Sequence, residues 1–441
     1  MTAEIAIMNK EALALAADSA VTLREEKGQK IFTSANKIFT LSKYHPVGIM
    51  IYGSAKFMEV PWETIIKIYR NKLSKKKFDT LKAYAVDFID FLSKENRLFP
   101  ESEQDKYFTS NIYSYFYYIR RKIEQKVEAI ISDKSKITKS EIKEITSTII
   151  KRHYDTWKKT TLLPSVPQKY VPNLIDKYRA TIDKAKKDVF ENLPISKSLS
   201  NSLTEIAGSL FAKFPIEVVH SGISGVVIAG FGQKEVFPSL QSFLLDGVAH
   251  NFLKYREDKH IKIAFDNNAT IVPFAQSEMV ATFMEGVEPG YETAIENFLS
   301  RIFNEYPHII IDKIDKLDDN EKKSLKEKLK EISNKEFKLC KKKLEDYRRK
   351  NFVDPVIKVV AMLPKDELAA MAESLVNLTS FKRKISMEAE TVGGPIDVAV
   401  ISKGDGFVWI KRKHYFKPEL NPQFFANYYK ETENGKEKEE R

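Results

Sequence analysis

The chain is poor in cysteine and in long apolar runs. Cys340 is the only cysteine among 441 residues, which excludes a disulfide within one chain and a zinc site built on cysteines. No run of about 18 apolar residues is present, and no basic stretch followed by an apolar block opens the sequence. We therefore expect no signal peptide, no membrane partner and a cytoplasmic location.

Several familiar sites are also missing. The seven histidines show no metal-ligand spacing, so we predict no structural metal. The absence of a Gly-x-x-x-x-Gly-Lys-Ser/Thr loop excludes ATP hydrolysis through a P-loop. The stretch from His220 to Gly225 does not match the Gly-x-Ser-x-Gly elbow of serine hydrolases. We expect no cofactor.

The charge balance is basic, with a formal net charge of +11. Such an excess can indicate a nucleic acid or another anionic partner. Most lysines alternate with glutamates along predicted helices, so we interpret them as solvated helix faces. The aromatic and cationic residues between 107 and 122 could stack on bases, but we favour a buried helix face. Nucleic-acid binding remains the alternative.

Hydrophobic patterning predicts strands, then helices, then strands, helices and strands. That order is typical of an α+β fold with helices packed on a largely antiparallel sheet. Glycine is absent from 54 to 207, where lysine, tyrosine and isoleucine dominate and helices are predicted. The predicted strands cover 2–8, 12–18, 37–42, 47–52, 225–231, 237–245, 261–265, 270–272, 396–402 and 406–411.

The composition changes also suggest domain limits. We predict a discontinuous domain over 2–73 and 204–430, interrupted by a helical insertion over 74–203. A Lys/Glu-rich stretch over 315–350 reads as a helical arm, and the charged tail over 431–441 as disordered.

The second residue can carry chemistry of its own. If Met1 is removed, Thr2 holds a hydroxyl and a free α-amine on one residue. An unperturbed α-amine has a pKa of about 7.7–8.0, so a useful fraction is neutral near pH 7. The amine can then accept the hydroxyl proton, in place of the histidine of a Ser–His pair. Many unrelated sequences begin with Met-Thr, so the pattern gains meaning only from its surroundings.

Three further landmarks follow in order. Asp18 ends a predicted strand that could pair with the first one. Lys37 enters the third predicted strand. Gly53, within Gly-Ser-Ala, ends the fourth strand just before a helix predicted from about residue 55 to 73. A helix N-terminus there would present backbone N–H groups to an oxyanion.

These landmarks resemble those of the proteasome β-subunits and of the related bacterial HslV peptidase. In that family the mature chain begins with threonine, followed by an Ala-Asp-Ser motif, a Lys-Ile or Lys-Val strand and a Gly-Gly-Ala or Gly-Ser-Ala turn. The resemblance covers roughly residues 2–69 and resumes more weakly from about 225. It implies a four-layer αββα sandwich of the N-terminal-nucleophile (Ntn) hydrolase type, with an inserted helical region.

The resemblance also implies a role for each residue. Thr2 would be the nucleophile and, through its amine, the general base. Lys37 would lie beside it and lower the pKa of the amine and hydroxyl, and Asp18 would hold Lys37. The Gly53 N–H would face the oxyanion. Ser277, before a predicted helix, would lie near the amine.

One motif of the family is missing. The family carries Asp-x-x-Ser-Gly before its last inner strand. Counting back from Gly393, the serine position holds Val392 and the aspartate position holds Ala389. Glu390 and Thr391 stand one residue out of register and are possible substitutes.

We therefore predict a threonine-type amidohydrolase, a peptidase acting on peptide or protein substrates and assembled as a homo-oligomer. The helical insertion would shape substrate access or bind a protein partner. Two alternatives stay open. One is a non-catalytic proteasome-like scaffold whose basic insertion binds a protein or nucleic acid, and the other is a small-molecule amide hydrolase. Taken singly, Asp18 and Gly53 have ordinary turn roles, Lys37 an exposed strand role and Ser277 an N-cap role.

Overall fold

The computed structural model describes residues 3–25, 28–95, 97–134, 136–214, 222–386 and 392–426. Within these residues the chain is a mixture of helices and antiparallel sheets, which confirms the α+β class. The chain divides into two compact units. The terminal unit comprises residues 1–38, 236–238 and 262–441, and the central unit comprises 39–235 and 239–261.

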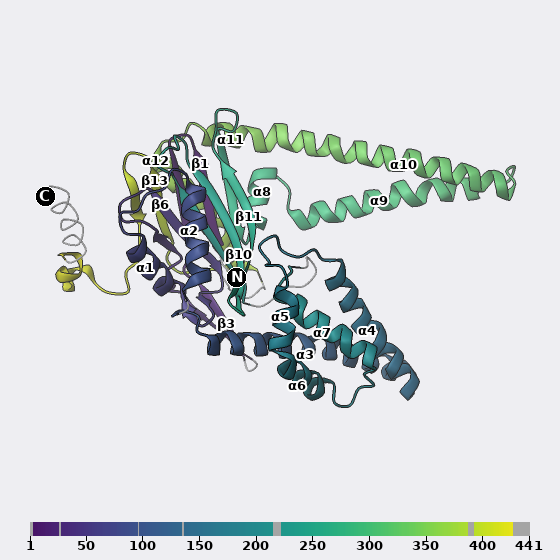
Figure 1. Cartoon of the computed structure of the whole chain (residues 1–441). Helices are drawn as coiled ribbons and strands as arrows, with labels where there is room; N and C mark the ends of the chain where they lie inside the picture. The colour runs from purple at the N-terminus through teal and green to yellow at the C-terminus, as the bar shows by residue number, and fades with distance from the viewer. Residues whose placement is uncertain are drawn as a thin grey trace. The chain divides into compact units, whose positions relative to one another are not determined.

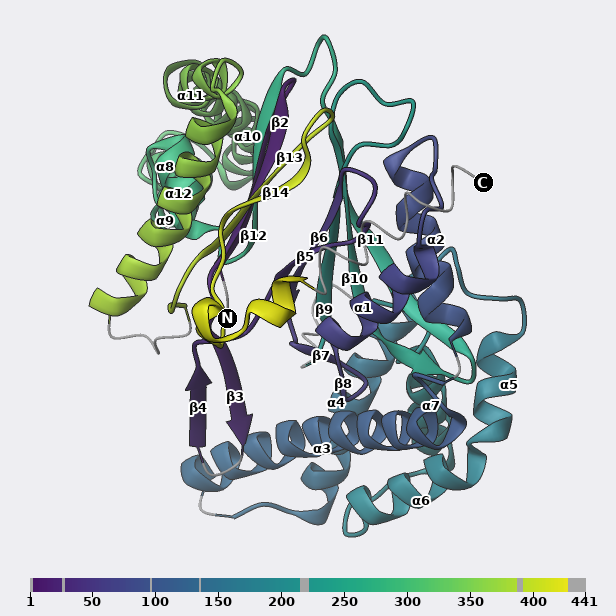
Figure 2. The same ribbon diagram turned by 90° about the vertical axis from the view of Figure 1, so that its left-hand side faces the viewer.

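The terminal unit is built on a five-stranded sheet in which early and late strands interleave (Figure 2). Its order is β12-β1-β2-β13-β14, and each neighbouring pair is antiparallel. The first two strands of the chain thus lie between strands made more than 250 residues later. The bounds are β1 Ala3–Asn9, β2 Ala12–Ala17, β12 Ala269–Ala275, β13 Asp397–Ser402 and β14 Gly406–Lys411.

Helices cover one face of this sheet. Helix α12 (Lys365–Ile385) packs on β1, β2 and β13, and α11 (Asp354–Val360) packs on β12. The strand β2 alternates alanine with leucine, and its alanines share the helix-side core with Ala369 and Ala372 of α12. Small side chains on both elements let the helix approach the sheet closely. A short helix, α8 (Glu278–Glu285), packs beside α12.

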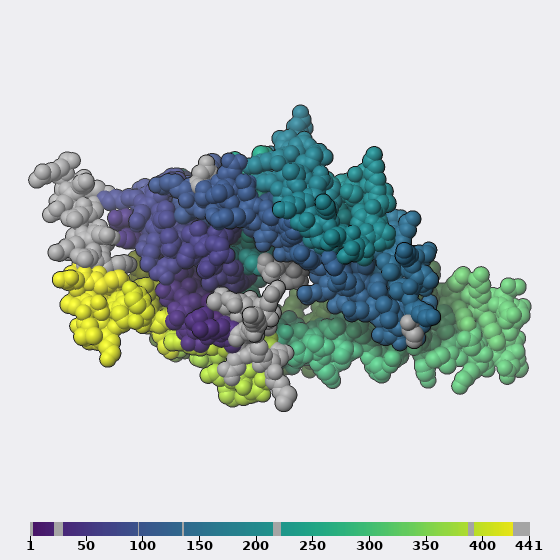
Figure 3. All heavy atoms as spheres, turned by 90° about the horizontal axis from the view of Figure 1, so that it is seen from below, coloured from purple at the N-terminus to yellow at the C-terminus, as the bar shows by residue number. Residues whose placement is uncertain are grey.

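A long helical hairpin also belongs to the terminal unit (Figures 1 and 3, green). It consists of α9 (Pro289–Asp312) and α10 (Asp319–Arg348), which pack against each other. Phe303 and Phe337 meet with ring centroids 5.9 Å apart, and Lys341 pairs with Glu296 at 2.8 Å. A π-helical turn over Arg349–Val353 leads from α10 into α11. The stretch predicted as an arm is therefore the second helix of a hairpin.

The terminal unit also holds a small hairpin near its start (Figure 2). It joins β3 (Val21–Glu25) to β4 (Gly28–Phe32).

The central unit contains the second five-stranded sheet, apart from its end residues Ile38 and Lys262. Its order is β11-β10-β9-β6-β5. Two helices, α1 and α2, share a core with β6, β9 and β10. The bounds are β5 Ile38–Thr40, β6 Val47–Gly53, β9 Ser224–Gly230, β10 Ser239–Ala249, β11 Phe252–Lys262, α1 Trp62–Leu73 and α2 Leu81–Lys94.

Five further helices of the central unit pack into a bundle with a core of its own (Figure 2). Phe108, Tyr115 and Phe116 lie buried in that core, which confirms the predicted buried helix face, whereas Tyr117 and Tyr118 on the same helix are exposed. The bounds are α3 Glu101–Lys134, α4 Lys139–Lys159, α5 Tyr170–Lys177, α6 Arg179–Phe190 and α7 Lys197–Ser209.

A buried lysine ties this bundle to the second sheet. Lys254 of β11 donates to the Leu210 carbonyl at 2.6 Å and to Asp246 of β10 at 2.7 Å. Complete burial lowers the pKa of Lys254, although the carboxylate of Asp246 opposes that shift. Among the helices of the described segments, none combines the length and apolar character needed to cross a membrane.

Candidate site at the start of the first strand

Asp18 organises the end of the first sheet. It follows β2 directly and is buried. One carboxylate oxygen accepts a hydrogen bond from the Ala3 N–H at 3.0 Å. The other accepts from the N–H of Ala20 at 3.2 Å and of Gly393 at 2.9 Å. Backbone donors to a carboxylate form strong, charge-assisted bonds, so Asp18 fixes three chain segments at one point.

Lys37 meets the same carboxylate. Its ammonium donates to Asp18 Oδ1 and lies 3.2 Å from Glu4 Oε1. The Lys37 side chain is 6% exposed, and those of Asp18 and Glu4 are fully buried. A buried ammonium needs such partners because its desolvation is costly. The structure therefore brings Lys37 and Asp18 together, as the family resemblance implies.

Glu4 was not predicted from the sequence. It lies in β1 opposite Ala17 of β2 and Phe274 of β12, on the face away from the helix-side core that holds Ile5 and Ile7. Glu4 is the one charged residue in the predicted strand over 2–8, and this feature of the sequence could have marked it as a candidate site residue. Two buried carboxylates thus flank one buried ammonium.

Ser277 stands at the same end of this sheet. It follows Ala275, the residue of β12 that pairs with Ala3, and it immediately precedes α8. The Ser277 side chain is exposed and makes no capping hydrogen bond to α8, so an N-cap role is not what it performs here.

A buried side-chain bond holds the corner that contains Ser277. Arg383, near the end of α12, donates from Nε to Gln276 Oε1 at 2.8 Å and lies 3.6 Å from Glu278. Ala275 has a positive φ of 57° where the strand turns into this corner. Sequence reasoning missed both Gln276 and Arg383, which lie 107 residues apart in the chain.

Four positions named in the sequence analysis lie outside the described residues. These are Thr2, which precedes Ala3, and Ala389, Glu390 and Thr391 near the missing motif. Val392 is described and is buried in the apolar core between the first sheet and its helices. At the position where the family carries serine, this chain therefore has a core residue.

Gly53 belongs to the central unit. It ends β6 with a positive φ of 80°, and a Cβ there would lie 2.5 Å from the Ile223 carbonyl oxygen, so glycine is required. The prediction of a helix N-terminus at this point is wrong. A hairpin of β7 (Lys56–Phe57) and β8 (Val60–Pro61) intervenes, and α1 begins only at Trp62. Met58 and Glu59, both with positive φ, make its turn.

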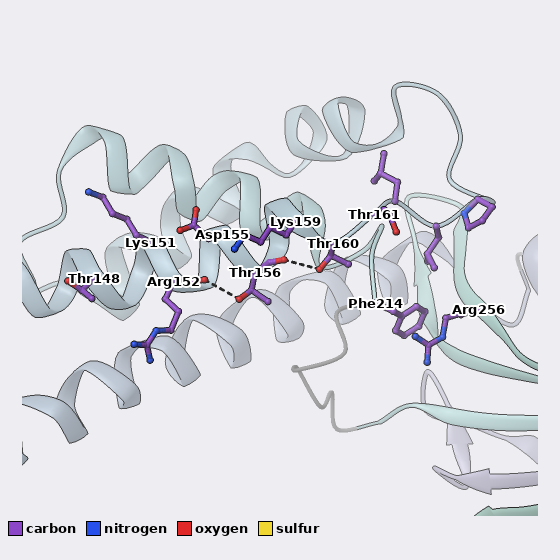
Figure 4. Close-up of a pocket in the computed structure, with 13 residues that line it drawn as sticks. Thr148, Lys151, Arg152, Asp155, Thr156, Lys159, Thr160, Thr161, Phe214 and Arg256 are labelled. Atoms are coloured by element: carbon purple, nitrogen blue, oxygen red, sulfur yellow. Dashed lines mark hydrogen bonds between the residues drawn. The ribbon is translucent and has the colours of Figure 1, made fainter. Parts of the chain in front are cut away.

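The central unit also carries a basic groove of about 1000 Å³ (Figure 4). It is bordered by α4, residues 160–164, Phe214 and β11. Figure 4 shows the cations spread along the groove rather than converging on one point. A second groove of about 700 Å³, between α3 and α4, shares Arg152 with it. The charged lining residues of the first groove are Lys151, Arg152, Asp155, Lys159 and Arg256.

No group of three or more potential metal ligands was found among the described residues. Comparison with protein-family models found no model that matches the sequence, and comparison with curated proteins found no match either. The resemblance to the proteasome family therefore rests on the residues and contacts given above.

Proposed function

We propose that this protein is a threonine-type amidohydrolase, a peptidase that uses Thr2 as its nucleophile after removal of Met1. One observation carries the proposal. The carboxylate that holds the buried Lys37 ammonium also accepts the N–H of Ala3, the residue next to Thr2. Asp18 thereby links the Lys37 ammonium to Ala3, the first residue of β1.

The chemistry follows from these groups. The Thr2 hydroxyl attacks the substrate carbonyl while the α-amine accepts its proton. Breaking the C–N bond passes that proton to the leaving amine and yields an acyl ester, which water hydrolyses. The Lys37 ammonium disfavours protonation of the nearby amine and stabilises the developing alkoxide. In this proposal Ser277 lies beside the amine.

We also propose the four-layer αββα arrangement for the two sheets. Two features support it. In β1, Ile5 and Ile7 belong to the helix-side core, yet Ala6 and Met8 on the opposite face are equally buried and apolar. In β9 every residue is buried. Sheets that are apolar on both faces are typical of inner layers.

An assembly and a location accompany the proposal. A cytoplasmic homo-oligomer is proposed, on the family resemblance and on the single cysteine, which suits a reducing compartment. The helical bundle α3–α7 is proposed to shape access for peptide substrates or to bind a protein partner.

The test combines mass and labelling. Intact mass of the purified protein should show loss of Met1, and retention of Met1 overturns the proposal. A peptide epoxyketone, which needs both a hydroxyl and a neighbouring amine, should label the protein at Thr2. Labelling should vanish in Thr2→Ala and fall strongly in Lys37→Met. The exposed Lys82→Met serves as the matched control and should label normally. Undiminished labelling of Thr2→Ala would count decisively against the assignment.

The basic groove supports a second candidate function, a scaffold that binds single-stranded nucleic acid. Among the described residues, no ion pair was found for Lys151, Arg152 or Lys159 of α4. Lys151 and Lys159 are eight residues apart, or about 12 Å along a helix, which suits an extended polyanion better than one compact ion. Exposed Tyr118 in the neighbouring groove offers a stacking surface.

Salt dependence distinguishes this candidate. A labelled oligonucleotide should bind with an affinity that falls steeply as salt rises. In Lys151→Glu/Lys159→Glu the slope of log affinity against log salt should shrink by about 0.7 for each lost phosphate contact. The matched control is Lys184→Glu/Lys187→Glu on α6, where both lysines are exposed. Equal binding by both double variants would exclude the groove as the nucleic-acid binding site.

A further inference from the structure

The apolar surface of helix α9 is wider than the strip that packs against α10. Ile295, Leu299 and Phe303 recur every four residues, are partly buried, and include the ring that meets Phe337 of α10. A second row lies beside the first, since residues on a helix advance by about 100° each. Its members are between 40% and 61% exposed, and they are Phe298, Ile302, Tyr306, Ile309 and Ile310.

Helix α10 has exposed apolar residues of its own. Ile332 and Leu339 are seven residues apart and therefore lie on one side of the helix, and they are 55% and 42% exposed. Exposed apolar rows on two neighbouring helices indicate an interface rather than scattered exposed residues.

The charges of the hairpin identify a matching occupant. Helix α9 has four acidic residues and one arginine, a net charge of −3. Helix α10 has seven acidic and eleven basic residues, a net charge of +4. In a dimer with two-fold symmetry, a contact of α9 with the partner's α10 is automatically repeated by α10 with the partner's α9. Each acidic α9 would then contact two basic helices, its own α10 and the α10 of the partner.

We propose that two copies of this chain pair through their α9–α10 hairpins to form a four-helix bundle. The second row of α9 and the Ile332–Leu339 side of α10 form its new core. A second copy fits this surface because the hairpin itself supplies both the apolar rows and the complementary charges. This interface is independent of any hydrolytic activity.

The test uses the full-length protein in sedimentation equilibrium over a concentration series. The wild type should be a dimer, and Phe298→Gln/Ile302→Gln should raise its dissociation constant at least about 100-fold, as expected when central apolar contacts are removed. The matched control is Val86→Gln, an exposed apolar residue on helix α2. Unchanged far-ultraviolet circular dichroism would show that the variants remain folded.

A charge variant tests which helices meet. Lys335→Glu/Lys342→Glu makes α10 less basic and should weaken the dimer as well. Two differently tagged copies of the wild type should exchange and purify together, which distinguishes pairing between copies from contacts within one chain. A monomer at all concentrations, or a dimer unaffected by the α9 substitutions, would overturn the proposal. A dimer insensitive to the charge variant would overturn the pairing of α9 with the partner's α10.

Discussion

The N–H of Gly393 donates a 2.9 Å hydrogen bond to Asp18, a residue 375 positions earlier in the chain. In return, the Gly393 carbonyl accepts from the N–H of Ser19 at 3.1 Å. The loop that precedes β13 is thereby attached to the turn that follows β2. Asp18 holds this loop, the first residue of β1 and the Lys37 ammonium at once, so its environment couples local stability to the proposed chemistry.

Replacing the lysine of this cluster should destabilise the terminal unit. Lys37→Met leaves the buried carboxylates of Asp18 and Glu4 without their cation, and breaking a buried ion pair in this way typically costs about 3–5 kcal/mol. The free energy of unfolding from urea titration measures the effect. The double variant Lys37→Met/Glu4→Gln should recover part of the loss. A change of less than about 1 kcal/mol in Lys37→Met would contradict a buried, paired lysine.

Glu4 should tune the pH dependence of the proposed reaction. Glu4→Gln keeps the shape of the side chain but removes one negative charge beside Lys37. A more positive surrounding lowers the pKa of the Thr2 amine, so the neutral amine becomes available at lower pH. The rate of epoxyketone labelling against pH should shift to lower pH. A shift in the opposite direction would show that Glu4 does not act through charge on the amine.

Arg383 should control the order of the corner before α8. Arg383→Leu removes the charged donor to the buried Gln276 Oε1, which should cost about 1–3 kcal/mol. Hydrogen–deuterium exchange should rise over residues 275–280, the corner that includes Ser277. The exposed Arg301→Leu is the matched control and should leave exchange there unchanged. Equal protection in Arg383→Leu would rule out this positioning role.

The helical bundle should lose stability as the solution becomes acidic. Burial, and then the charges of Arg152 and Lys122, lowers the pKa of His153, whose ring packs on Tyr115 and Tyr118. Because the unfolded chain binds a proton near pH 6.5 and the folded one resists it, stability is complete above about 6.5 and falls below that pH.

This pH effect can be read from one tryptophan. Trp157 donates to Tyr115 at 2.7 Å and so reports on the same region once Trp62 and Trp409 are replaced by phenylalanine. In that background, His153→Gln should lose less stability than its parent between pH 6.5 and 5, a window set by the ordinary histidine pKa. The exposed His260→Gln is the control. Parallel curves for His153→Gln and its parent would refute the prediction.

Periodic segments made much of the fold predictable. The apolar runs of β1 and β2 and the β-branched run of β6 each match a predicted strand closely, because strands buried in a core leave short apolar stretches in the sequence. The polar strand β11 was missed, and a strand was wrongly expected over 261–265. β11 is an edge strand with a solvated face, so its composition resembles a loop.

Unusual turns and contacts between residues far apart in the chain could not be predicted. The hairpin turn at Met58 and Glu59 has positive φ without glycine or asparagine. The sequence therefore did not indicate that a hairpin lies between Gly53 and the start of α1. The contact between Asp18 and Lys37 was expected from the family resemblance, which covers both residues. Glu4 and Arg383 depend on strand register and on contacts across more than 100 residues, which one sequence does not specify.

The strand order of the first sheet also determines when, during synthesis, that sheet can be completed. β1 and β2 leave the ribosome first, but their outer neighbours β12 and β13 are made hundreds of residues later. At about 5–20 residues per second, translation from Asp18 to Gly393 takes roughly 20–75 s. Until then Asp18 lacks one of its three backbone donors and the sheet lacks its last strands. A nascent or truncated chain that ends before Gly393 therefore carries Glu4, Asp18 and Lys37 but cannot form this contact, so the Asp18 cluster is completed only after Gly393 has been made.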